Sequence, residues 1–421
     1  MERLARELRN GGHGVFVITG TFEPRNAVEI AEREQDGVRI YTIHRSDLYF
    51  DRWEKTYEPR VSRALLELLK RLRPDVVHGH HFIRLSRDIA HTAALAGIPA
   101  VLTLHDFTTT CLIGFRAPGA GASFCDLQPA YGDCVPCAGA VTPAIPLAPE
   151  SEFRLLRDDF RSELLTARFV CCISSTQRAL LAKYHQLPEA HFSVVPLALV
   201  AELPRGTEAG SGPLRVASWG IQMERKGAHV LIEAVRRLPA GTVEAEIFGR
   251  FDDPGYESRC RAAAKDHSIQ FRGRFEWSEL ASTPLHASVL PSLTFETFGL
   301  TLDESRALGH PVIATDLGAY RERADRSTLL FPAGDAGALA AHLARLASDR
   351  EALAGLRAAV APPEPFGAYV TRMEALYAAA IAKGPPDPGL GGFDSQRHPS
   401  ESEFAAREAE FVRRLSGGPP Q

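Results

Sequence analysis

The chain has 421 residues, and 45% of them are hydrophobic, which is enough for two domains that each bury a core. Its formal net charge of −4 gives no basic field over the whole sequence, which argues against a nucleic-acid partner. No run approaches the length of an apolar membrane span, and the polar start MERLARELRN lacks the apolar stretch of a signal peptide. We therefore expect a cytoplasmic protein without a transmembrane segment.

Short β-branched runs alternate with helical stretches twice along the chain. In the first half the expected strands are 14–19, 38–43, 75–78, 100–104, 169–173 and 192–196, and the expected helices include 2–9, 58–73 and 84–96. In the second half the expected strands are 214–219, 244–248, 269–271, 287–290, 312–314 and 328–331, with helices at 228–237, 256–264, 302–308 and 336–347. This alternation predicts an α/β fold of two Rossmann-like, doubly wound domains that face a cleft.

The composition also indicates the boundaries between these parts. An N-terminal domain is expected at 1–200 and a second domain at 213–364, joined by the polar, Gly-rich linker 201–212. The segment 384–421 is rich in Pro, Gly and Ser, so we expect a disordered tail, with a short helix near 403–415 that offers a partner or peripheral membrane contact.

Polar side chains follow two neighbouring strands of the first domain. His78, His80 and His81 lie in the run DVVHGHH, and His105 and Asp106 end the run TLHD. The carboxyl ends of parallel neighbours meet at one edge of a sheet, so these side chains are expected at the mouth of the cleft. The H-x-H spacing by itself leaves a metal site, an acceptor pocket and a purely structural role open.

An insert at 107–150 carries Cys111, Cys125, Cys134 and Cys137, the last pair spaced as Cys-Val-Pro-Cys. Four thiols can order a loop around one tetrahedral zinc where the loop has no hydrophobic core. Four free thiols are the alternative, because cytosolic disulfides are disfavoured and a redox C-x-x-C needs a thioredoxin-like context.

In the second domain a strand is followed by WGIQMERKG, which ends in Arg225, Lys226 and Gly227 at the start of a helix. A cation placed beside the free amides of a helix start can meet a diphosphate, and a surface lysine is the plain alternative.

The run PSLTFETFGLTLDESRALGHPVIATD places Glu296 and Glu304 eight positions apart across a strand-to-helix junction. Thr297 is expected to cap the helix, and Gly299 to let a ligand approach the backbone without a Cβ in the way. The N–H groups at the start of this helix can bind a phosphate, and two carboxylates flank them. This combination suggests that the ligand is a nucleotide-sugar.

The stretch ETFGLTLDESRALGHPVIATDLGAYRE resembles the E-x7-E donor segment of retaining glycosyltransferases of family 4, which have the GT-B fold. The resemblance implies that Glu296 contacts the donor sugar and Glu304 the ribose, with Phe298, Gly299 and Leu300 as the F-G-L of the motif. It also implies a crossover helix at 365–383 that returns to the N-terminal domain.

Other segments carry the same resemblance. His105 matches a family histidine near the donor sugar, which would make His105 and Glu296 the catalytic residues and place His78, His80, His81 and Asp106 on the acceptor side. Lys226 and Gly227 match the family's G-R-L-x-x-x-K-G, but Ile221 stands at the Arg position, so Arg225 or Gln222 would have to replace that cation. A subset of the family also has a Cys after the histidine and a C-x-x-C farther on.

The N-terminal domain opens with a helix, so it apparently lacks the first strand and Gly-rich loop of the family. The true start lies upstream, or the chain is a degenerate copy.

The implied activity is transfer of a sugar from a nucleotide-diphosphate-sugar to an unknown hydroxyl acceptor, in polysaccharide, glycolipid or glycosylated-metabolite synthesis. No cofactor is required for catalysis, and zinc would be structural only. The alternatives are a GT-B nucleotide-sugar epimerase and a catalytically dead nucleotide-sugar-binding protein. The place of action is the cytoplasm or, peripherally, the inner face of the membrane.

Overall fold

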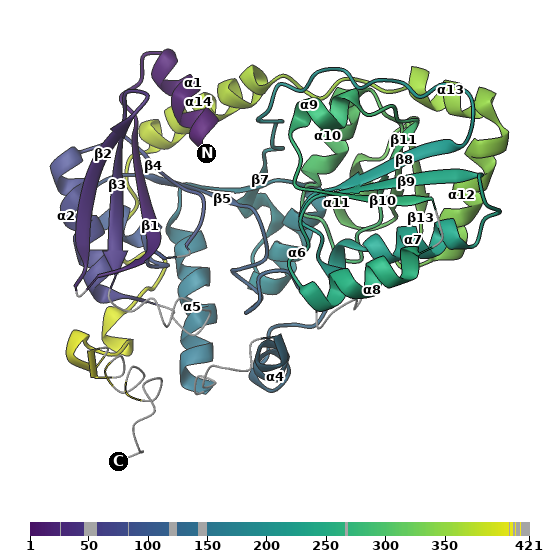
Figure 1. The fold of residues 1–421 in the computed structure, drawn as a ribbon. Helices are drawn as coiled ribbons and strands as arrows, with labels where there is room; N and C mark the ends of the chain where they lie inside the picture. Colours follow the sequence, from purple (N-terminus) through teal and green to yellow (C-terminus); the bar gives the residue numbers. More distant parts are fainter. Residues whose placement is uncertain are drawn as a thin grey trace.

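A computed structural model describes residues 1–25, 27–45, 57–82, 84–117, 124–141, 150–265 and 268–403, and the single positions 405, 406, 409 and 413. The described chain forms two α/β parts that lie side by side (Figure 1). Within these residues no helix combines the length and the apolar character that crossing a membrane requires.

The first part contains two sheets. One has the order β1-β3-β2, with β1 (Phe16–Pro24) parallel to β3 (Val38–Arg45) and β2 (Glu29–Gln35) antiparallel to it. The other is parallel, in the order β4-β5-β6-β7, with bounds Val77–Gly79, Ala100–Leu104, Phe169–Cys172 and Phe192–Val194. Among the described residues no strand joins the two sheets, so β1 and β4 are both edge strands.

Six helices belong to this part. They are α1 (Glu2–Asn10), α2 (Pro59–Leu72), α3 (Ile89–Leu95), α4 (Tyr131–Val141), α5 (Glu150–Thr166) and α6 (Ser175–His185). The start of α2 shows how the sequence sets such an end: Glu58 accepts a hydrogen bond from the Arg60 N–H, and Pro59 fixes the first helical φ.

The second part is one six-stranded parallel sheet in the order β10-β9-β8-β11-β12-β13. The strands are β8 (Leu214–Trp219), β9 (Val243–Phe248), β10 (Ile269–Gly273), β11 (Ala287–Leu290), β12 (Val312–Thr315) and β13 (Thr328–Phe331). The helices are α7 (Ala228–Arg236), α8 (Pro254–Ala264), α9 (Trp277–Ser282), α10 (Leu300–Leu308), α11 (Gly318–Arg323), α12 (Ala336–Ser348) and α13 (Arg350–Ala358). Val216, Ile247 and Val289 are fully buried among these helices, as expected for a sheet covered on both faces.

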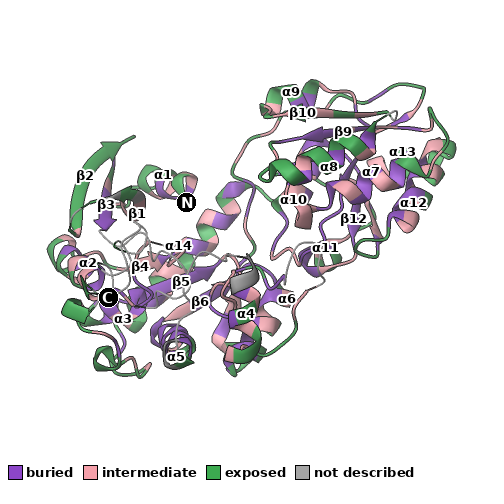
Figure 2. Ribbon diagram, turned by 60° about the horizontal axis from the view of Figure 1, so that its bottom comes forward, coloured by how far each residue is buried: buried purple, intermediate pink, exposed green. Residues whose placement is uncertain are grey.

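All twelve predicted strands are present, which confirms the fold class, but the prediction missed β2. Every residue of β2 is exposed (Figure 2), so the strand EIAEREQ has no apolar face for a pattern to reveal. Its backbone pairing with β3 holds it in the sheet.

Helix α14 (Phe366–Lys383) follows the second part in sequence but packs on the first. Its Tyr369 and Met373 are buried in one cluster with Leu4 of α1 and Val101 of β5. This is the placement expected of a crossover helix.

The tail prediction is wrong for residues 384–403. The Arg168 guanidinium donates to the carbonyl of Gly384 at 2.7 Å, and His398 Nε2 lies 3.2 Å from Asp159 Oδ1 in a buried contact. The ring of His398 stacks on Phe393, so the segment has apolar and polar partners that composition alone does not reveal. The helix expected near 403–415 falls largely outside the described residues.

The expected linker is tied to the second part. The Thr207 N–H donates to the Ala281 carbonyl at 2.7 Å. The backbones of Glu208 and Leu285 form an isolated parallel β-bridge.

Candidate functional site

An ion pair at the carboxyl end of the second sheet joins two of the predicted site residues. Lys226 Nζ lies 2.5 Å from Glu296 Oε1, and the Ser292 hydroxyl donates to the same oxygen at 2.8 Å. The Glu296 side chain is only 15% exposed, whereas that of Lys226 is 41% exposed. Burial raises the pKa of Glu296, but the charge and hydrogen bond of Lys226, with the Ser292 bond and the charge of Arg225, lower it overall. Glu296 is therefore a carboxylate at neutral pH.

Gly227 lets the lysine reach the glutamate. It has φ +76°, and a Cβ at this position would lie 2.0 Å from the carbonyl oxygen of Pro291, just after β11. Only glycine allows the loop after β8 to lie this close to the loop after β11. The two loops follow neighbouring parallel strands, so the site lies where ligands bind in doubly wound sheets.

The second glutamate is held by a residue for which the sequence analysis proposed no role. Trp219, the last residue of β8, donates its indole N–H to Glu304 Oε2 at 2.7 Å. Burial raises the pKa of Glu304, and the Trp219 bond opposes part of that rise. The sequence did offer a signal for Trp219, because its indole N–H is a polar group at the end of a central strand.

Two details of the helix start differ from the expectation. Gly299, at φ +72°, is the N-cap of α10, and Thr297 instead donates its hydroxyl to the carbonyl oxygen of His105 at 2.8 Å. The glycine is required by packing, because a Cβ would lie 2.4 Å from the Tyr320 ring.

The F-G-L residues on either side of this cap differ in exposure. Phe298 is buried under the guanidinium of Arg323, whose carbon lies 3.8 Å from the ring centroid, while Leu300 is exposed. Phe298 can therefore offer a ligand its backbone only.

Arg225 and Gln222, the two candidates to replace the family arginine, lie in different surroundings. Gln222 is buried, and its amide donates to the carbonyls of Gly220 and Phe248 at 3.2 and 2.8 Å. The Arg225 guanidinium lies 4.1 Å from the ring centroid of Phe115 in the first part, a cation–π contact. Burial lowers the pKa of Arg225 overall, and the negative charge of Glu296 opposes part of that change. The two charges are therefore close enough to interact.

The first part brings three of the predicted histidines together. His80 Nδ1 lies 3.0 Å from His105 Nε2, and the rings of His78 and His80 lie 3.9 Å apart. His81 points elsewhere and binds Asp106 at 3.1 Å, and Asp106 also accepts the Thr108 N–H at 2.8 Å. Burial raises the pKa of Asp106, but the His81 and Thr108 bonds lower it overall.

The two parts of the protein contact each other close to His105. The Thr297–His105 bond spans 192 positions and places the loop of Glu296 against the end of β5. Phe295 packs between Phe107 and Phe124 with ring centroids 5.5 and 4.8 Å away. Glu322 of α11 caps α6: its carboxylate accepts the N–H groups of Ser175 and Thr176, both at 2.8 Å. Sequence reasoning missed Glu322, because its partner lies in the other half of the chain.

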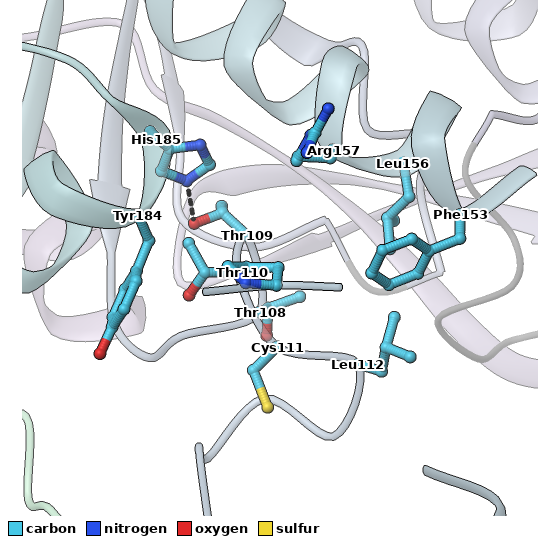
Figure 3. Close-up of a pocket in the computed structure, with 11 residues that line it drawn as sticks. Thr108, Thr109, Thr110, Cys111, Leu112, Phe153, Leu156, Arg157, Tyr184 and His185 are labelled. Carbon is cyan, nitrogen blue, oxygen red and sulfur yellow. Dashed lines mark hydrogen bonds between the residues drawn. The ribbon is translucent and has the colours of Figure 1, made fainter. Parts of the chain in front are cut away.

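A small cavity in the first part is lined by Thr108–Thr110 and His185 (Figure 3). His185 Nε2 lies 3.0 Å from the Thr109 hydroxyl, and within the described residues its Nδ1 has no hydrogen-bond partner. The cavity measures about 20 Å³, room for about one water molecule. A sugar ring does not fit there, so this cavity is no acceptor pocket.

The charges of the four cysteines of the insert influence one another. Burial raises the pKa of Cys134 and Cys137, and the charges of Cys111 and Cys125 raise it further. Among the residues described here, no group of three or more His, Cys, Asp or Glu side chains is placed to hold a metal ion. Zinc at these cysteines stays a prediction.

Two family models match the chain: Glycosyltransferase Family 4 over residues 1–202, and Glycosyl transferases group 1 over residues 214–349. The chain belongs to the family 4 glycosyltransferases. A phosphatidyl-myo-inositol mannosyltransferase of Mycobacterium leprae (strain TN) is 35% identical over 128 residues, which are 29% of this chain. That match spans only about a third (34%) of the mannosyltransferase's own length.

Solved structures support the fold. A sucrose-phosphate synthase of Thermosynechococcus elongatus superposes with a TM-score of 0.60 at 18% identity, over 90% of this chain and 92% of that one. An α,α-trehalose-phosphate synthase (UDP-forming) of Burkholderia vietnamiensis gives 0.59 at 14% identity, over 90% and 93%. At such low identity these matches establish a shared GT-B fold.

Proposed function

We propose that this protein transfers a sugar from a nucleotide-diphosphate-sugar to an acceptor hydroxyl with retention of anomeric configuration. The observation that carries the proposal is the meeting of two predicted catalytic regions: Thr297, next to Glu296, binds the His105 backbone across the two halves. The sequence resemblance and the family models support the same activity. The names of the relatives reported above describe sugar transfer or synthesis, which does not favour an epimerase or a dead binding protein.

The donor diphosphate would lie among Lys226, Arg225 and the first N–H groups of α10. Lys226 is paired with Glu296, so a phosphate must compete for the ammonium. Once the phosphate holds Lys226, Glu296 is free to accept hydroxyl groups of the sugar. Glu304, already oriented by Trp219, would accept the ribose hydroxyls.

The placement of these side chains around the donor accounts for the steps of sugar transfer. The bond between the anomeric carbon and the phosphate oxygen breaks, and the two cations stabilise the charge that develops on the leaving diphosphate. The acceptor hydroxyl attacks from the same face and gives its proton to the leaving phosphate oxygen. Neutral His105 would contact the sugar, and no protein nucleophile is needed.

Binding is tested first with UDP, GDP, ADP and dTDP in thermal denaturation. A nucleotide that binds the folded state at about 100 times its Kd adds about 2.7 kcal/mol of stability, which is easily measured as a rise in Tm. Glu304→Gln should abolish most of the rise, and Glu244→Gln, which changes another part-exposed acid of the same sheet, should not. The corresponding nucleotide-sugars then serve as donors, with release of the nucleoside diphosphate as the readout. The proposal fails if none of the four nucleotides raises the Tm at millimolar concentration.

A further inference from the structure

A chain of contacts leads from helix α14 to the predicted catalytic histidine. It begins at His78 of β4, whose two ring nitrogens are both held: Nδ1 lies 2.6 Å from the Tyr377 hydroxyl and Nε2 lies 2.8 Å from the Thr103 hydroxyl. A ring held at both nitrogens cannot rotate or flip without losing two hydrogen bonds. Because burial raises the pKa of Tyr377, its hydroxyl keeps its hydrogen and can donate it to Nδ1.

The fixed ring of His78 supports the ring of His80. The centroids of the two rings lie 3.9 Å apart, at an interplanar angle of 39°. His80 in turn lies nearly parallel to His105, at 19° and 5.3 Å, with His80 Nδ1 3.0 Å from His105 Nε2. Nε2 of His105 is therefore committed to His80, and Nδ1 is the ring nitrogen left for a ligand.

The contact between the two histidines constrains their protons. A hydrogen bond between two ring nitrogens holds one hydrogen, so the tautomer of His80 fixes that of His105. Both rings are neutral at neutral pH: burial lowers the pKa of His105 to about 4, and burial together with the neighbouring histidines lowers that of His80 well below its usual value. The tautomer of His105 decides whether its free nitrogen donates a hydrogen bond to the sugar or accepts one.

We propose that His80 is a positioning residue that selects the tautomer of His105, and that Tyr377 of α14 anchors His80 through His78. The proposal replaces the acceptor-side role that the sequence suggested for His78 and His80, and it rests on the role of His105 in the proposed function. It also gives the crossover helix a part in the site, because α14 is the only described element that supplies a hydrogen-bond partner to His78 from outside the sheet.

Nuclear magnetic resonance of ¹⁵N-histidine-labelled full-length protein tests the tautomer without any assay of activity. Long-range ¹H–¹⁵N correlations show which ring nitrogen carries the hydrogen, and the His105 signals are identified by their loss in His105→Asn. We expect one neutral tautomer of His105 in the native protein and a mixture in His80→Leu. His80→Asn, which retains a polar group near the position of Nδ1, should restore a single form. An unchanged His105 spectrum in folded His80→Leu overturns the proposal.

Tyr377→Phe is the milder test, since it removes one hydroxyl and keeps the ring. Its control is Tyr369→Phe, because Tyr369 is buried on the same helix and its hydroxyl makes no hydrogen bond to the residues described. Tyr377→Phe should change the His78 signals and shift the tautomer balance of His105, whereas Tyr369→Phe should change neither. A change confined to His78 refutes the anchoring by α14.

Turnover distinguishes positioning from general loosening of the fold. With a donor found in the thermal screen, Tyr377→Phe and His80→Leu should lower kcat on the order of tenfold at unchanged KM for the donor, the change that one net hydrogen bond accounts for. A parallel loss of donor affinity would show that the contacts are merely structural. If no donor is turned over, the proposed function fails, but the spectra still decide the tautomer.

Discussion

Replacing Lys226 by methionine removes the ammonium that faces Glu296 at 2.5 Å and leaves the carboxylate with the Ser292 hydroxyl as its remaining short contact. Glu296 is largely buried, so an unpaired charge there is costly. A hydrogen bond to a charged group contributes about 1.5–3 kcal/mol, and the half-exposed lysine reduces this, so we expect Lys226→Met to lower the free energy of unfolding by about 1–2 kcal/mol. Glu296→Gln should cost less, because the released lysine can turn to water.

The pH dependence gives the sign of the effect. In the native protein the pKa of Glu296 is lowered, so its contribution to stability is present above the ordinary glutamate pKa and is lost as the pH falls through the folded value. Without Lys226, burial dominates and raises the pKa, so the folded variant takes up a proton more readily than the unfolded chain does. The deficit of Lys226→Met should therefore shrink as the pH falls from 7.5 to 5.

Urea denaturation of native protein, both single variants and the double variant at each pH measures this directly. The double variant should be less destabilised than the sum of the single changes, because removing both partners leaves no buried charge. Our account of the pair is refuted if Glu296→Gln costs as much as Lys226→Met, or if the Lys226→Met deficit grows in acid.

Three further changes test other parts of the site. Glu304→Gln should weaken binding of the nucleoside diphosphate by about 1–3 kcal/mol in calorimetry, and an affinity equal to that of Glu244→Gln would contradict its role at the ribose. Glu322→Ala removes the cap of α6 from the other half of the chain, so small-angle scattering should show a larger radius of gyration; no change would mean that the remaining contacts suffice. If zinc orders the insert, purified protein should carry about one metal per chain that Cys134→Ser releases, and metal-free protein with an unchanged protease pattern would exclude it.

Much of the fold could be predicted because its signals are local. Several predicted strands, such as β5, β11 and β12, are short apolar runs buried on both faces, and such runs stand out in a single sequence. β2 was missed because its residues are all exposed, and residues 384–403 were judged by composition although His398 has a buried partner in Asp159.

The residues of the candidate site also fall into those that the strand pattern could predict and those that depend on tertiary contacts. His105 directly follows β5, and Glu296 and Lys226 lie in the loops after β11 and β8, so parallel topology predicts that they gather at the carboxyl edges of the sheets. What Thr297 binds was not predictable: a threonine before a helix is a common cap, and only the tertiary structure places the His105 carbonyl within its reach. Tyr377 and Trp219 are further cases, because each acts through a partner far away in sequence.

The candidate donor site and the contact between the two halves share one segment of backbone. The Glu296 carbonyl accepts the Ala319 N–H at 2.8 Å, and Gly318 packs so close that a Cβ would lie 2.7 Å from the same oxygen. These two residues begin α11, which carries Glu322 to the start of α6. A phosphate that takes Lys226 from Glu296 therefore acts on the residue whose backbone holds α11 in place. Because Thr297 is the next residue and binds His105, any shift of the Glu296 loop must be accommodated at the Thr297–His105 bond as well as at the cap that Glu322 forms on α6.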